Sequence, residues 1–187
     1  MHRYHLIVAA LVAFLGVPAI AGAQETATAD RSTQRLFFEN LRKLCGTQLE
    51  GVTEFPQDPK HDFAGKKLVM SVQTCSESEI RIPFRVGEDT SRTWIISLSE
   101  KGLLLKHDHR HADGTPDKVT MYGGWAAPGG TAMQQRFAAD EETAKLIPEA
   151  STNVWTLTIG EGGNEFTYAL ERHAQPRYKA TLKRAAD

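Results

Sequence analysis

Two histidines separated by a single residue are the residues best suited to chemistry in this sequence. His107 and His109 lie in the stretch Gly102–Tyr122, and His111 follows, so three of the seven histidines fall close together. If the chain is extended here, positions i and i+2 point to the same side, and two imidazoles can reach one metal ion. His107, His109 and His111 are therefore candidate ligands for zinc or another first-row metal.

The same stretch has a second interpretation, as the polar end of a hairpin. Lys106 and Arg110 flank the histidines, and their positive charges oppose a bound cation. The segment Asp113–Asp117 contains Gly and Pro and has the composition of a plain turn. A solvated strand end or a hydrogen-bonded structural cluster of histidines is therefore the alternative to a metal site.

The elements that would position these histidines are predicted to be strands. From Thr47 to Arg184 apolar residues recur mostly at every second position, and Ile80, Ile82 and Phe84 show this alternation well. The predicted strands are 47–55, 67–75, 79–86, 92–99, 102–109, 117–127, 131–138, 151–159, 164–173 and 177–184. Because most of them have only one apolar face, we expect an all-β antiparallel barrel of about 8–10 strands.

Two helices are predicted beside the strands. Leu36, Phe37, Leu41 and Leu44 recur at helical spacing and indicate an N-terminal helix over 32–44. A short helical insertion is expected from Asp140, which suits an N-cap, to Ile147, before Pro148.

The start of the chain has the pattern of an export signal. An apolar run over 6–17 follows a weakly basic start, and the small residues of 21–23 suit a cleavage site, which predicts a signal peptide over 1–23. The run is too short for a stable membrane span. We expect a flexible leader over 24–31, a single barrel domain over 32–187, and a secreted or periplasmic location.

Cysteine and charge content support this assignment. Cys45 and Cys75 are the two cysteines of the chain, and in an exported protein they predict one disulfide. The formal net charge is −1, so the composition gives no basis for binding nucleic acid.

The order of these elements resembles the lipocalin-related calycin barrels. A short helix precedes a glycine-flanked first strand, 45–51 (CGTQLEG), meandering hairpins follow, and the last strand is 177–184 (RYKATLKR). The chain is also similar to small secreted bacterial proteins of unassigned function with such a barrel. These resemblances imply the barrel and carry no ligand with them. The His-x-His pair after a glycine separately resembles the cupins, another class of β-barrel, which bind metals.

Aromatic residues on the apolar strand faces are candidates for lining a ligand cavity. They are Phe84, Trp94, Trp125, Trp155, Phe166, Tyr168 and Tyr178.

The sequence has no Gly-x-Ser-x-Gly nucleophile motif and no glycine-rich phosphate loop, so it names no catalytic residue and favours a binding protein over an enzyme. The function expected is binding of a small, largely apolar molecule inside the barrel, with no cofactor. The alternatives are a metal protein or metal-dependent enzyme using the histidine pair, and a structural or interaction module whose barrel is filled. The oligomeric state is left open.

Overall fold

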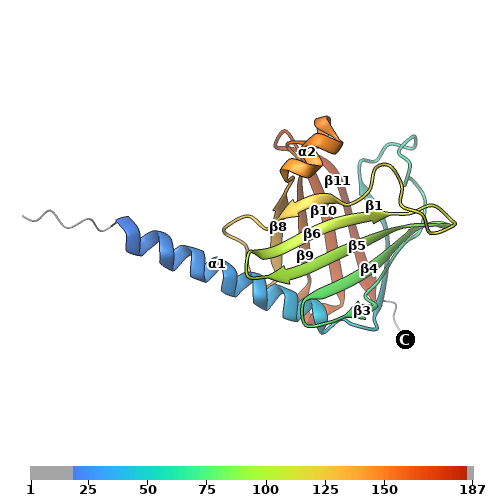
Figure 1. Cartoon of the computed structure of the whole chain (residues 1–187). Helices are drawn as coiled ribbons and strands as arrows, with labels where there is room; N and C mark the ends of the chain where they lie inside the picture. The colour runs from blue at the N-terminus through green and yellow to red at the C-terminus, as the bar shows by residue number, and fades with distance from the viewer. Residues whose placement is uncertain (1–18, 185–187) are drawn as a thin grey trace, which may run out of the picture.

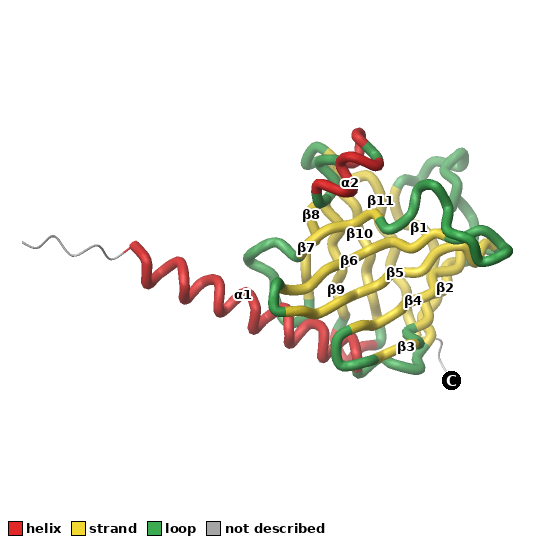
Figure 2. Tube along the Cα trace, in the orientation of Figure 1, coloured by secondary structure: helices red, strands yellow, loops and turns green. Residues whose placement is uncertain are grey.

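Strands with one apolar face curl into a nearly closed antiparallel barrel, which confirms the expected fold class (Figures 1 and 2). A computed structural model of the chain describes residues 19–184. The wall follows the order β7-β6-β5-β4-β2-β1-β11-β10-β9-β8, and β3 pairs with β4 beside this path. The end strands β7 and β8 meet where Ala126 bridges to Phe137 and the Ala127 N–H donates to the Arg136 carbonyl at 2.7 Å.

Most strand bounds follow the predicted segments, but the expected strand 67–75 is divided into two short strands. The strands are β1 (Gln48–Phe55), β2 (Leu68–Ser71), β3 (Thr74–Cys75), β4 (Glu79–Val86), β5 (Asp89–Ser99), β6 (Gly102–His109), β7 (Tyr122–Trp125), β8 (Gln134–Ala138), β9 (Val154–Ile159), β10 (Glu165–Arg172) and β11 (Gln175–Arg184). The expected strand 117–127 is shorter in the structure. Its first part is a loop, in which the Met121 N–H donates to the His107 carbonyl at 2.7 Å and Met121 has a positive φ of 58°.

Strand β4 shows how the alternating sequence positions the core. Ile80, Ile82, Phe84 and Val86 are buried, while the residues between them are partly exposed. Pro83 lies inside the sheet, opposite the interruption between β2 and β3. Its missing N–H therefore falls where the neighbouring strand is broken.

Helix α1 (Ala19–Arg42) covers one end of the barrel with its C-terminal part and projects away from the barrel at its N-terminal end (Figure 1). Phe37, Phe38 and Leu41 are buried, and the Gln34 side chain accepts a hydrogen bond from the Leu103 N–H at 3.0 Å. The helix also includes the segment 24–31, for which a flexible leader was expected. This segment contains alanine, glutamine and glutamate and no proline or glycine, so its composition favours helix.

Helix α2 (Glu141–Leu146) lies over the junction of β7 and β8, near the upper end of the barrel in Figure 2. Asp140 caps it by accepting from the Thr143 N–H at 2.9 Å, which confirms the predicted cap. The same carboxylate pairs with Lys106 of β6 at 2.7 Å. Thr143 Oγ1 accepts from the Gly123 N–H and donates to the Gly123 carbonyl, at 2.7 and 2.8 Å. These contacts hold α2 against the outer wall.

The predicted disulfide is present and joins Cys45, after α1, to Cys75 in β3. It ties the covering helix to the barrel wall. The predicted signal peptide lies outside the described residues up to position 18. Among residues 19–184, no helix combines the length and the apolar character that crossing a membrane requires.

Candidate ligand-binding site

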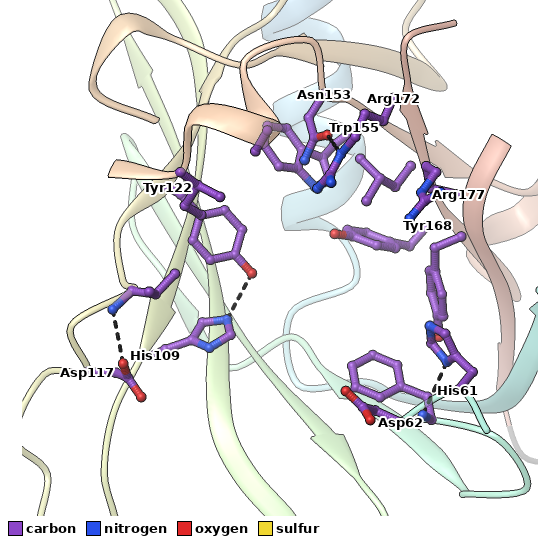
Figure 3. Close-up of a pocket in the computed structure, with 16 residues that line it drawn as sticks. His61, Asp62, His109, Asp117, Tyr122, Asn153, Trp155, Tyr168, Arg172 and Arg177 are labelled. Atoms are coloured by element: carbon purple, nitrogen blue, oxygen red, sulfur yellow. Dashed lines mark hydrogen bonds between the residues drawn. The ribbon is translucent and has the colours of Figure 1, made fainter. Parts of the chain in front are cut away.

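A cavity of about 440 Å³ opens at the end of the barrel opposite α1 (Figure 3). Three connections contribute to its rim, besides the β10–β11 hairpin. The β1–β2 loop contributes His61 and Phe63, the β6–β7 loop contributes Val119, and the segment before β9 contributes Ile147 and Asn153. The site therefore combines residues from distant parts of the chain.

The wall of this cavity is largely aromatic. Tyr122, Trp155, Tyr168 and Tyr178 reach it from β7, β9, β10 and β11. The His61 ring stacks on the Tyr178 ring with centroids 5.5 Å apart. Flat apolar surfaces of this kind favour a ligand with a planar apolar part.

The barrel is filled below the cavity. Trp94 stacks under Tyr168 with ring centroids 4.6 Å apart, and Phe84 stacks on Trp94 at 4.4 Å. Phe166 is fully buried beside them. The cavity is thus a cup at the mouth of the barrel, with a closed aromatic floor.

His107 belongs to the floor of the site. It is 2% exposed, its Nδ1 lies 3.2 Å from the Tyr122 carbonyl oxygen, and its Nε2 lies 3.0 Å from the Tyr168 hydroxyl. A carbonyl oxygen only accepts, so Nδ1 carries the proton and the Tyr168 hydroxyl donates to Nε2. Burial lowers the pKa of His107 to about 3, which keeps the ring neutral. Both ring nitrogens are already hydrogen-bonded, so neither is free for a metal ion.

His109 shares the inward face of β6 and lies at the edge of the cavity. Its Nε2 is 3.1 Å from the Tyr122 hydroxyl. Burial, and then the neighbouring Arg92 guanidinium, lower the pKa of His109. His111 is exposed in the turn beyond the strand. Within the described chain, no three His, Cys, Asp or Glu side chains are grouped so that they could hold a metal ion.

The predicted aromatic residues divide into three groups. Trp155, Tyr168 and Tyr178 line the cavity. Phe84, Trp94 and Phe166 belong to the packed core beneath it. Trp125 corrects the expectation, because it lies on the outer face and is 38% exposed. It pairs with Leu104, which also points outward, whereas Tyr122 takes the inward position opposite His107.

The polar residues of the rim were not predicted from the sequence. The Arg172 Nε donates to the Asn153 side-chain oxygen at 2.8 Å, and Arg177 lies nearby on the same hairpin (Figure 3). Arg92 lies over the Phe63 ring, 5.0 Å from its centroid. Arg172 and Arg177 lie beside the β10–β11 turn, where a register shift between Leu170 and Glu171 interrupts the alternating pattern that would predict which way they point. Only the clustering of charge around the turn 173–174 marks them in the sequence.

The tyrosine hydroxyls of the cavity are neutral at physiological pH. Burial raises the pKa of Tyr122 and of Tyr178 to about 12, and it raises the pKa of Tyr168 well above its usual value. A general base or nucleophile needs a pKa near the working pH, and these shifts run the other way. The arrangement is suited to hydrogen bonding and stacking.

Comparison with known proteins adds only distant likenesses. No family model and no curated protein sequence matches the chain. Among solved structures, a redesigned β-barrel is similar with 12% identity and a TM-score of 0.32, covering 78% of this chain and 95% of its own. A de novo designed fluorescence-activating β-barrel has 10% identity and a TM-score of 0.26, covering 75% and 92%. The assignment of the fold therefore rests on the strand pairing of the protein itself.

Proposed function

We propose that this protein is an exported binding protein that holds a small, largely apolar molecule in the cup at the open end of its barrel. The observation that carries the proposal is the contrast between the two ends. One end is covered by α1 and filled with side chains, whereas the other keeps an open cavity of about 440 Å³ with an aromatic wall. Pockets for small ligands have volumes of roughly 300–1,000 Å³ and similar linings.

The closed floor restricts the shape of the ligand. Tyr168, Trp94 and Phe84 are stacked one below another and fill the axis of the barrel under the cavity. A molecule with one or two rings fits such a cup better than a long alkyl chain, which needs a deep channel. Stacking against Trp155 and Tyr168 would supply most of the binding energy.

Export and a relationship to the lipocalin-related barrels are part of this proposal. The disulfide between Cys45 and Cys75 supports a location outside the reducing cytoplasm. The test is the mass of the protein isolated from its host. A mature chain beginning near Gln24 and recovered outside the cytoplasm agrees with the proposal, and an intact N-terminus on cytoplasmic protein opposes it.

Binding is tested with a neutral fluorescent probe, N-phenyl-1-naphthylamine, whose emission rises in apolar surroundings. Leu170 lines the cavity, and Leu170→Trp fills part of it. Its neighbour Ala169 pairs with Thr156 on the adjoining strand and does not line the cavity, so Ala169→Trp is the matched control. We expect probe binding by the wild type and Ala169→Trp, and affinity at least about tenfold lower for Leu170→Trp. Equal binding by the two variants would refute the cavity as the site.

A further inference from the structure

Two arginines that line the cavity have no acidic partner, in contrast to Arg92 and Arg136. Arg92 pairs with Asp89, and Arg136 pairs with Glu171 at 2.8 Å. Arg172 and Arg177 form no ion pair within residues 19–184. Arg172 instead donates to the neutral side chain of Asn153. Both guanidinium groups line the cavity and retain unused donors.

The acidic residues of the cavity lie away from these arginines. Figure 3 shows Asp117 on the far side, beside His109, and Asp62 at the opposite rim from Arg172. The Asp117 carboxylate accepts from the Val119 N–H at 3.0 Å, a bond that lowers its pKa and keeps it negative. The charge of the rim is therefore divided, with its positive part on the hairpin of β10 and β11.

We infer that the cavity selects a compact aromatic carboxylate, with its ring against Trp155 and Tyr168 and its carboxylate on Arg177 and Arg172. This inference rests on the proposed function and specifies its ligand class. A guanidinium binds a carboxylate through two parallel hydrogen bonds, which gives orientation as well as affinity. The aromatic wall and the arginines lie side by side, so one small molecule can contact both at once.

The test compares three probes with the same ring and different charge: 2-naphthoate, 2-naphthamide and 2-naphthylmethylammonium. Isothermal titration calorimetry of the full protein measures each dissociation constant. We expect 2-naphthoate to bind about tenfold more tightly than the amide, because hydrogen bonds between charged partners outweigh neutral ones. The ammonium probe should bind most weakly, and added salt should reduce the preference for the carboxylate.

Arginine variants test which side chains produce the preference for the carboxylate probe. Arg172→Gln with Arg177→Gln should bind the carboxylate and the amide equally well. Arg177→Gln alone changes an exposed side chain and should lose several-fold in carboxylate affinity, which keeps the test valid if the double variant folds poorly. Arg81→Gln is the control, because Arg81 pairs with Glu79 in β4 and does not line the cavity. It should retain the full preference.

The results distinguish a failure of the carboxylate preference from a failure of ligand binding itself. A carboxylate preference that is lost in the arginine variants and kept in Arg81→Gln supports the inference. Equal binding of carboxylate and amide, or a preference for the ammonium probe, overturns it. If N-phenyl-1-naphthylamine still binds in that case, the proposed binding of an apolar molecule stands, and only the preference for a carboxylate is given up. If no probe binds, both fail.

Discussion

At the scale of single residues, His107 determines how the floor of the cavity is built. Its two ring nitrogens join β7, through the Tyr122 carbonyl, to β10, through the Tyr168 hydroxyl. The pair His107 and His109 on one face of a strand could be predicted, because that face follows from alternation alone. The partner Tyr168 lies 61 residues away, so its contact depends on closure of the barrel and could not be predicted.

The buried histidine makes stability depend on pH. An unfolded chain protonates its imidazoles near pH 6.5, whereas burial lowers the pKa of His107 to about 3 in the folded protein. Between these values the unfolded state binds more protons, so the free energy of unfolding falls as the pH falls, by up to about 1.4 kcal/mol per pH unit. Urea denaturation at pH 6 and pH 5 should show a loss of about 1 kcal/mol.

The variant His107→Gln should be less stable at neutral pH and should lose much of this dependence. His111→Gln, in the exposed turn, serves as the control and should keep the wild-type slope. Equal slopes for wild type and His107→Gln would contradict the buried neutral imidazole.

At the scale of elements, α2 stabilises the junction of β7 and β8. The Asp140 cap follows from the sequence, because Asp before Glu-Glu is a local pattern. The role of Lys106 does not follow from the sequence, since a lysine that alternates with inward-facing strand residues is expected to lie on the solvated face. In the structure Lys106 is 7% exposed, because α2 packs over it and supplies the Asp140 carboxylate. A contact between elements far apart in sequence thus overrides the local expectation.

Removing the lysine should destabilise the protein by about 2–4 kcal/mol, since Lys106→Met leaves the Asp140 carboxylate largely buried without its cation. Combining Lys106→Met with Asp140→Asn should recover part of this loss, because no unpaired charge remains buried and asparagine still caps the helix. Urea denaturation at pH 7 measures each free energy. Lys145→Met, at the exposed pair with Glu141, is the control and should show no measurable change. A Lys106→Met variant as stable as this control would contradict the buried ion pair.

At the scale of the whole molecule, the barrel has a closed end and an open end. Strands with one apolar face were sufficient to predict the barrel, helical spacing predicted the N-terminal helix, and the two cysteines predicted the disulfide. Which end stays open could not be predicted, because it depends on how the side chains of the wall fill the interior. Trp94 and Trp155 both point inward, yet only Trp155 reaches the cavity.

The disulfide should contribute mainly to global stability. It closes a loop with a sequence separation of 30, for which the chain-entropy relation gives about 3–4 kcal/mol. We expect Cys45→Ser with Cys75→Ser to lose about this free energy of unfolding in urea while still binding N-phenyl-1-naphthylamine, because the bridge is not among the residues that line the cavity. Loss of probe binding in a folded variant would show that the two ends of the barrel are coupled.

Native mass spectrometry of the protein purified from its host, without organic extraction, is the most direct test for a ligand in the cup. We expect a retained small organic molecule on the wild type, absent from Leu170→Trp and present on Ala169→Trp. Release under denaturing conditions should yield a compound with an aromatic ring and a carboxyl group. A wild-type protein that carries no such molecule, and gains none when incubated with 2-naphthoate, would contradict a ligand-binding cup.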